Sequence, residues 1–124
     1  MAVRDFTDLV CWRLSHALKC EVLEFTATGP ASRDFKYRDQ IRASSASAPS
    51  NIAEAFGRYR RKDAARFCDY AIASLHETLN HLIDGYDRKY IDARLSSRLS
   101  NLARAALKAT KNWMFYLRRN ERHD

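Results

Sequence analysis

Residues 44–63 read SSASAPSNIAEAFGRYRRKD, and the spacing of small and apolar residues around this stretch predicts a closely packed helix. These residues recur every three or four positions, at Ile41, Ser45, Ala48, Ile52 and Ala55 with Phe56. A second stripe with the same spacing is polar and consists of Ser44, Ser47, Asn51, Glu54 and Arg58. The helix is therefore expected to bury the first stripe and to carry a polar seam beside it.

Pro49 leaves two interpretations of this helix open. Proline lacks an N–H donor and disfavours helical geometry at the preceding residue, Ala48. Either one helix kinks at Pro49, or a second helix begins at Asn51, where Glu54 would complete a capping box. The apolar spacing passes through Pro49 without a break in phase, which favours the single kinked helix. Gly57 is expected to end it.

Three further helices are expected from alternating apolar spacings of three and four, over residues 7–26, 62–86 and 92–117. Thr7 or Asp8 is expected to cap the first of them. The turn signal Gly29-Pro30 is followed by a new cap at Ser32 or Asp34, where the helix of the opening stretch begins. Short joints make successive helices antiparallel, so the predicted fold is an all-α, antiparallel up-down four-helix bundle.

The composition agrees with one helical domain over residues 1–124. The chain has only three Gly and two Pro, and its 46% hydrophobic residues suffice for one core. Its three cysteines form no C-x-x-C pair, which favours reduced thiols in a cytoplasmic protein. No apolar run is long enough to span a membrane. The net charge of +7 and the pI near 9.6 indicate a polyanionic partner.

The basic residues form two clusters that contain aromatic residues, Tyr59 in the first and Trp113 and Tyr116 in the second. The clusters comprise Arg58, Arg60, Arg61, Lys62 and Arg66, and then Lys108, Lys111, Arg118 and Arg119. Up-down connectivity predicts that both lie at one pole of the bundle, where cations would neutralise phosphates. Trp113 and Tyr116 are expected more often in a core or an interface than as stacking platforms for bases.

The polar residues Asn51, Glu54, Arg58 and Glu77 have a functional and a structural interpretation. They would form either a catalytic or ligand-binding cluster, or a hydrogen-bonded network that fixes helix register or a subunit boundary. The second is favoured, because general acid–base chemistry would need a pocket and a partner residue that the sequence does not supply. His76 and His81 are five residues apart and point about 140° from one another on a helix, which argues against a metal site.

The residues of the opening stretch also resemble a known family, the four-helix bundle proteins that include the 23S ribosomal RNA intervening sequence proteins of bacteria. More distantly, the chain is similar to the accessory variability protein of diversity-generating retroelements. The matching residues are Ser47, Pro49, Asn51, Ile52, Ala53, Glu54, Gly57, Arg58, Ala71, Ser74 and Glu77, with Phe6, Leu9 and Trp12 near the start. Ala55 and Ala73 depart from the pattern, because the family often has glycine there.

This resemblance implies a homopentameric ring of four-helix bundles with a basic, nucleic-acid-binding surface and no catalytic activity or cofactor. It implies a structural or subunit-interface role for Ser47, Asn51, Glu54, Gly57 and Glu77. The function expected from the sequence is therefore non-enzymatic binding of RNA or DNA with low sequence specificity. The alternative is a protein-interaction or scaffold module that contacts an acidic protein partner.

Overall fold

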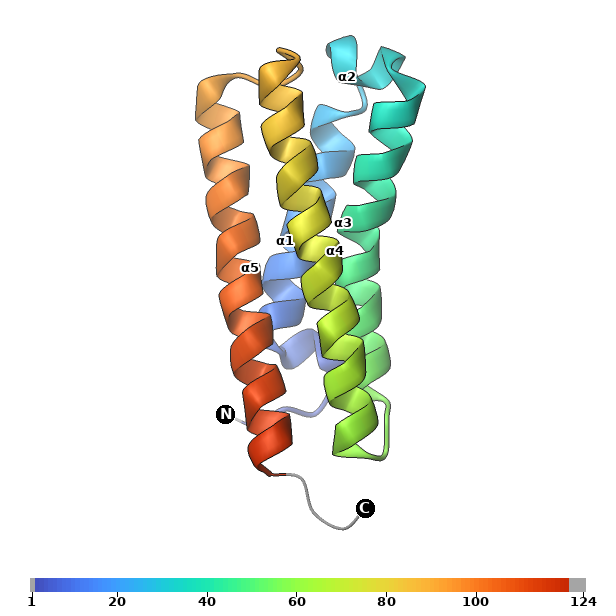
Figure 1. Ribbon diagram of the computed structural model, residues 1–124, viewed down its shortest axis with the longest axis vertical. Coiled ribbons are helices and arrows are strands. Elements are labelled where there is room, and N and C mark those ends of the chain that lie inside the picture. The colour runs from blue at the N-terminus through green and yellow to red at the C-terminus, as the bar shows by residue number, and fades with distance from the viewer. Residues whose placement is uncertain (1, 121–124) are drawn as a thin grey trace.

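Four long helices run side by side in the computed structural model, which describes residues 2–120 (Figure 1). They are α1 (Val10–Phe25), α3 (Phe35–Phe56), α4 (Arg61–Asp87) and α5 (Ala93–Arg119). Two short elements accompany them, the 3-10 helix η1 (Phe6–Asp8) and α2 (Gly29–Arg33). α1 and α4 each pack against both α3 and α5. The predicted all-α four-helix bundle is confirmed.

Successive long helices point in opposite directions, as the short joints predict. The α3–α4 joint, the start of α1 and the end of α5 all lie at the lower end in Figure 1. The other two joints, including α2, lie at the opposite end, which we call the upper pole. This topology brings residues together that are far apart in sequence. The end of α3 and the end of α5, for example, lie at the same pole.

α3 is a single helix that continues through Pro49, so the alternative with a new helix beginning at Asn51 is wrong. Pro49 is buried, and the Asn51 amide donates a hydrogen bond to the main-chain oxygen of Ser47 (2.9 Å). The Asp34 side chain caps the start of α3 by accepting a hydrogen bond from the Tyr37 N–H (3.1 Å), as expected. Gly57 ends the helix in a right-handed conformation (φ −80°), so the left-handed freedom of glycine is not used there.

The start of the first long helix differs from the prediction. The 3-10 helix η1 precedes it, and α1 begins only at Val10, after Leu9 and without a side-chain cap. Asp8 acts on η1 instead, because its carboxylate accepts hydrogen bonds from the N–H groups of Arg4 (3.0 Å) and Asp5 (3.2 Å). These two bonds lower the pKa of Asp8. The prediction that Thr7 or Asp8 caps the first long helix was therefore wrong. The Asp8 carboxylate instead accepts hydrogen bonds from N–H groups that precede η1.

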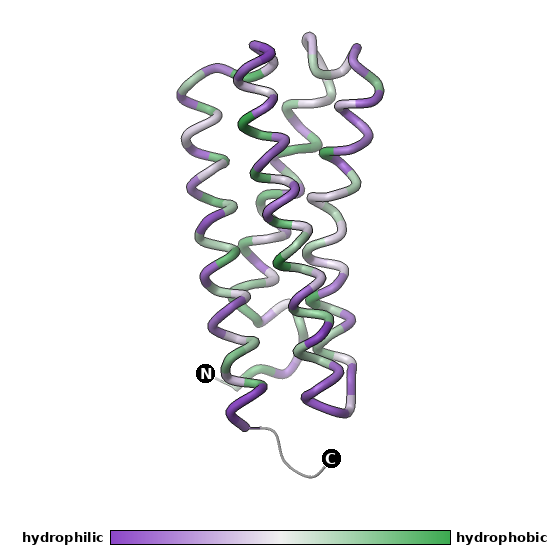
Figure 2. Tube along the Cα trace, viewed as in Figure 1, coloured by the Kyte–Doolittle hydropathy of each residue, from purple (hydrophilic) through white to green (hydrophobic). Residues whose placement is uncertain are grey.

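The core follows the apolar stripes that the sequence shows (Figure 2). Fully buried side chains come from every long helix, among them Leu18, Ile41, Leu75 and Leu99. The apolar stripe of α3 is buried as predicted from Ile41 to Ala55, and Phe56 at its end is half-buried. The small residues in the stripe let α3 pack close to its neighbours. Of the three thiols, Cys20 is exposed, whereas burial raises the pKa of Cys11 and of Cys68 to about 12.

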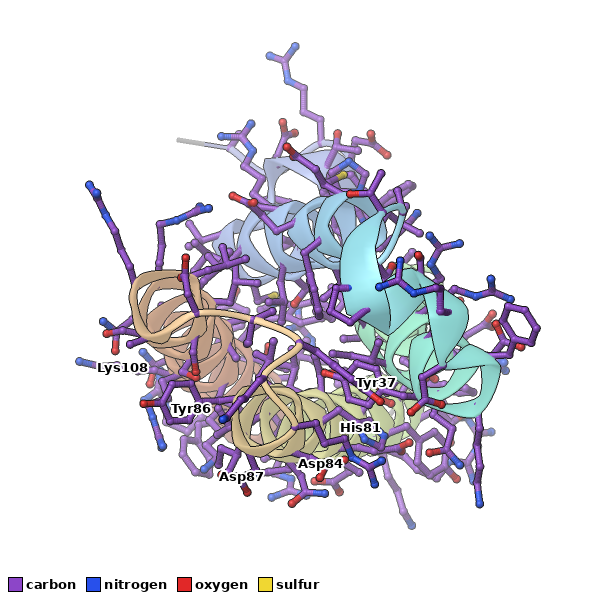
Figure 3. All side chains as sticks on the ribbon, turned by 90° about the horizontal axis from the view of Figure 1, so that it is seen from above. Tyr37, His81, Asp84, Tyr86, Asp87 and Lys108 are labelled. Carbon is purple, nitrogen blue, oxygen red and sulfur yellow. The ribbon has the colours of Figure 1, made fainter. Side chains whose placement is uncertain are left out.

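A polar network ties together the three segments that meet at the upper pole. The Tyr90 hydroxyl donates to the Asp34 carboxylate (2.6 Å), and Arg88 lies 3.7 Å from the same carboxylate. Nearby, the buried Tyr37 hydroxyl donates to the main-chain oxygen of His81 (2.7 Å). Figure 3 looks onto this pole and shows Tyr37, His81 and Asp84 together where α3 meets α4. Hydrogen bonds from Tyr90 and from the Tyr37 N–H, and the charge of Arg88, lower the pKa of Asp34.

Acidification is expected to destabilise the protein partly through Asp34. Because its pKa is lower in the folded state than in the unfolded chain, ionised Asp34 stabilises the fold at neutral pH. That contribution is lost as the pH falls below roughly 4 and through the folded-state pKa. In urea titrations followed by circular dichroism, Asp34→Asn should be less stable than the parent at neutral pH, and the difference should narrow in acid. A difference that stays constant with pH would contradict the prediction.

Candidate nucleic-acid interface

Seven of the nine basic residues singled out in the sequence meet at the lower end of the bundle. Two helix ends bring them there, because α3 and α5 both run toward this end and α4 starts from it. We call these seven the basic pole: Arg58, Arg60, Arg61, Lys62, Arg66, Arg118 and Arg119. All are exposed except Arg61, which is half-buried.

Lys108 and Lys111 do not lie at the basic pole, so the prediction that placed all nine cations there was wrong for these two. Lys108 precedes Arg119 by eleven residues, which corresponds to about 16 Å along the axis of α5. Both lysines lie instead along a groove of about 430 Å³ between α4 and α5. We call it the flank groove, and its lining residues are His76, Arg104, Leu107, Lys108, Lys111, Asn112 and Phe115.

The flank groove contains two charged or titratable residues that sequence reasoning missed as site residues, Arg104 and His76. The signal for Arg104 was present, because Arg104, Lys108, Lys111, Phe115 and Arg118 follow the 4,3,4,3 spacing of one helix face. Within the part of the chain that the structure describes, no acidic residue lines the groove. The stripe covers about 21 Å of α5 and leads from the flank groove to the basic pole.

Cations of the basic pole differ in how far neighbouring acids neutralise them. Arg58 pairs with Glu54 (2.6 Å), Arg118 with Asp69 (3.3 Å) and Arg66 more loosely with Asp63 (4.0 Å). Such exposed pairs are weak and leave the guanidinium able to exchange partners. Within residues 2–120, the remaining exposed cations have no ion-pair partner; they are Arg60, Lys62 and Arg119.

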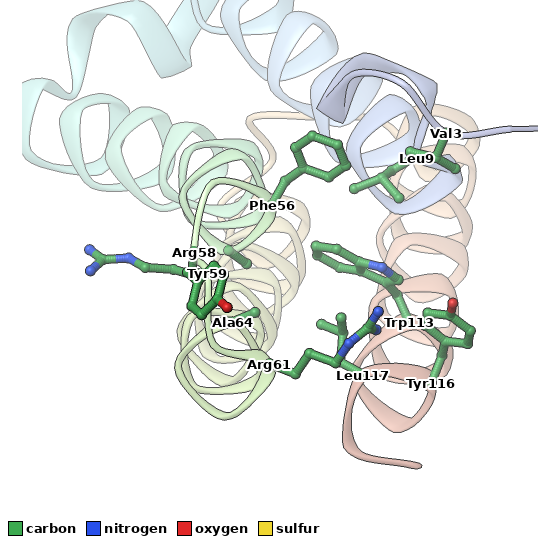
Figure 4. Close-up of a pocket in the computed structure, with 11 residues that line it drawn as sticks. Val3, Leu9, Phe56, Arg58, Tyr59, Arg61, Ala64, Trp113, Tyr116 and Leu117 are labelled. Carbon is green, nitrogen blue, oxygen red and sulfur yellow. The ribbon is translucent and has the colours of Figure 1, made fainter. Parts of the chain in front are cut away.

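A pocket of about 610 Å³ opens at the basic pole between the ends of α3 and α5 and the start of α4 (Figure 4). Its wall is largely apolar and aromatic, and none of the described residues that line it is acidic. We call it the pole pocket, and its lining residues are Val3, Leu9, Ala55, Phe56, Arg58, Tyr59, Arg61, Ala64, Trp113, Tyr116 and Leu117. The Arg61 guanidinium lies 5.7 Å from the centre of the Tyr116 ring.

The aromatic residues at this pole are only partly in the core. Trp113 is half-buried and packs against two groups of core residues, as expected, but it also faces the pole pocket (Figure 4). Tyr116 is 46% exposed and Tyr59 is 89% exposed. Sequence reasoning did not find the pocket, because its walls come from elements far apart in the chain.

The polar seam of α3 forms hydrogen bonds across the α3–α4 interface. The Ser47 hydroxyl accepts hydrogen bonds from the Asn51 amide (3.0 Å) and from the Ser74 hydroxyl of α4 (2.8 Å). One turn further along, Ser44 and Thr78 share a buried hydroxyl–hydroxyl bond of 2.8 Å. These directional bonds between two helices fix their relative register, which agrees with the structural interpretation of Ser47 and Asn51.

The other polar residues singled out do not join this network. Among the described residues, the ion-pair partner of Glu54 is Arg58, just beyond the end of α3, and both side chains are at least 40% exposed. Glu77 is also exposed and approaches His81 at 3.4 Å. Gly57 is the end residue of α3. The expected single cluster is therefore three separate groups within one chain, and a role for any of them at a subunit boundary stays a prediction.

Metal-ligating side chains are scattered over the part of the chain that the structure describes. Residues 2–120 contain no group of three or more His, Cys, Asp or Glu placed to hold a metal ion. His76 lines the flank groove, whereas His81 is half-buried beside Tyr37. Among the described residues, none of the helices is both long and apolar enough to cross a bilayer.

Comparison with known proteins agrees with this architecture. A crystal structure from the S23 ribosomal protein family, of a Bacteroides thetaiotaomicron protein of unknown function, superposes with a TM-score of 0.77. The two proteins are 20% identical over 85% of this chain and 98% of the other, which establishes a shared fold. No curated protein matches the chain. The family model of the 23S rRNA-intervening sequence protein matches residues 7–112. The chain therefore belongs to the 23S rRNA-intervening sequence protein family.

Proposed function

We propose that this protein binds nucleic acid, with RNA as the expected form, through the phosphates that contact its basic pole and flank groove. The observation that carries the proposal is a stripe of basic residues on α5 that starts in the flank groove and ends at the basic pole. Arg60, Lys62 and Arg119, which have no ion-pair partner in residues 2–120, lie at the pole where this stripe ends. At its other end, none of the described residues that line the groove is acidic. The family name, which refers to an intervening sequence of 23S rRNA, favours RNA over DNA.

The chemistry of this surface suits phosphate contacts better than the reading of base sequence. Lysine and arginine neutralise phosphates and release counterions, which gives affinity that falls steeply with salt. A stripe of about 21 Å on α5 has room for several phosphates of one strand. The sequence carries no motif with base-reading residues in a known arrangement, so low sequence specificity is proposed.

We also propose that the protein acts as a cytoplasmic homo-oligomer without enzymatic activity. The family resemblance supports a ring of five copies, in which every copy would contribute one basic pole. Joining several weak phosphate sites raises the effective affinity for a long strand well above that of one copy. Light scattering coupled to size-exclusion chromatography measures the number of copies, and a monomeric mass would overturn this part of the proposal.

The binding proposal predicts a large effect of charge reversal at the basic pole. Changing Arg60, Lys62 and Arg119 together to Glu should weaken binding to structured RNA at least tenfold at low salt. It should also reduce the slope of log affinity against log salt, because fewer phosphates are neutralised. Fluorescence anisotropy with labelled structured RNA, single-stranded RNA and duplex DNA measures both quantities and ranks the nucleic-acid forms.

A matched control separates local contact from net charge. Arg33, Lys36 and Arg94 are three exposed cations elsewhere on the chain, and changing them to Glu alters the net charge by the same amount. This control should weaken binding much less than the pole variant. Equal losses would contradict a binding surface at the basic pole. Weak binding of the parent to every nucleic acid, even at low salt, would favour the acidic protein partner instead.

A further inference from the structure

The pole pocket combines features that the phosphate contacts do not use. Its aromatic residues come from α3 (Phe56), from α5 (Trp113 and Tyr116) and from the α3–α4 joint (Tyr59). Its volume of about 610 Å³ falls inside the range typical of small-molecule sites. If the basic pole were only a helix end exposed to solvent, its structure would not require four aromatic side chains around one pocket.

The charge around the pocket indicates the chemistry of its occupant. Among residues 2–120, the charged residues that line it are Arg58 and Arg61, and both are cationic. The Arg58 side chain points away from the pocket and pairs with Glu54, so Arg61 is the cation that faces it (Figure 4). Arg61 lies over the Tyr116 ring, so its planar guanidinium sits beside an aromatic face at the pocket (Figure 4). Guanidinium groups bind phosphate and also stack on flat rings. An anionic ligand that carries a flat aromatic group satisfies both features of this site.

We infer that the pole pocket receives an unpaired base of single-stranded nucleic acid, whose adjoining phosphate lies against Arg61. The inference rests on the proposed function and deepens it. Bases stack on aromatic side chains whatever their identity, which agrees with low sequence specificity. Paired bases inside a duplex cannot enter the pocket without being unstacked, so the protein prefers unpaired segments to continuous duplex.

Trp113 provides a direct reporter of the pocket. Trp12, the other tryptophan, lies against Phe6 and His16, and Trp12→Phe keeps an aromatic ring at that position. In this background, a short single-stranded oligoadenylate should quench the fluorescence of Trp113. An abasic oligomer with the same number of phosphates should bind through the cations alone and leave the fluorescence unchanged.

A second pair of variants avoids disturbing the core. Tyr116→Leu keeps an apolar side chain but removes the ring, and Tyr59→Ser changes a residue that is almost fully exposed. Together they should weaken oligoadenylate binding roughly 5- to 140-fold, the range for lost stacking of one base, and leave abasic oligomer binding unchanged. The matched control is Tyr86→Leu, a tyrosine of similar exposure (49%) outside the pole pocket, which should change neither affinity.

The possible results distinguish this inference from the function on which it rests. Equal binding of the two oligomers without quenching of Trp113 would overturn the base pocket and leave phosphate binding in place. Failure of both oligomers to bind would overturn the proposed function itself. If adenosine monophosphate alone quenched Trp113 as strongly as the oligomer at equal concentration, the ligand would be a free nucleotide, and the inferred preference for single strands would be wrong.

Discussion

Replacing Gly85 with alanine is expected to lower the free energy of unfolding by about 2 kcal/mol, although alanine is the better helix former. Gly85 lies buried inside α4, and a Cβ atom there would be 2.2 Å from the Tyr37 hydroxyl and 3.1 Å from the ring carbon that bears it. Tyr37 is only 4% exposed, so its ring has little room to move. Any shift also breaks its 2.7 Å hydrogen bond to the main-chain oxygen of His81.

A double-mutant cycle tests the cause of this loss. In the parent, Tyr37→Phe should cost about 1 kcal/mol, because it removes one buried hydrogen bond. In the Gly85→Ala background, the same change should instead raise stability, because it removes the atom that clashes with the new methyl group. Urea denaturation followed by circular dichroism gives all four free energies. Additive effects of the two changes would show that Tyr37 does not determine the requirement for glycine.

The contact between Gly85 and Tyr37 also shows where prediction from sequence stopped. The spacing of apolar residues was sufficient for four helices and their buried faces, because helical periodicity is a local property. Gly85 lies inside α4, two residues before the helix ends at Asp87, where apolar spacing gives no reason for a glycine. The hydroxyl that requires a glycine there comes from α3, 48 residues away, and apolar spacing does not show such a contact.

The same distinction between local and tertiary information applies to the candidate interface. Up-down connectivity was sufficient to bring Arg60 and Arg119 to one pole. It failed for Lys108, because grouping the cations of α5 by sequence ignored the 1.5 Å rise per residue along the helix. The pole pocket is lined by side chains as far apart in sequence as Leu9 and Trp113. No spacing rule links such residues, so the sequence did not predict the pocket.

Ser15 is the position where truncating a side chain should stabilise the protein. Its side chain is completely buried, and its hydroxyl has no hydrogen-bond partner within residues 2–120. A buried hydroxyl without a partner loses its hydration without compensation. Ser15→Ala removes that loss and adds a better helix former in α1, so the free energy of unfolding should rise by about 1–2 kcal/mol. Urea denaturation measures the change.

Ser44→Ala is the matched control for this prediction, because it deletes the same atom from another buried helical serine. The Ser44 hydroxyl bonds to Thr78 (2.8 Å) and to the main-chain oxygen of Ile41 (3.2 Å). Its removal should therefore lower the free energy of unfolding by about 1 kcal/mol. One chemical change thus has opposite signs at two sites, because only one hydroxyl has a partner. If both variants lost stability, the Ser15 hydroxyl would have to be hydrogen-bonded in solution.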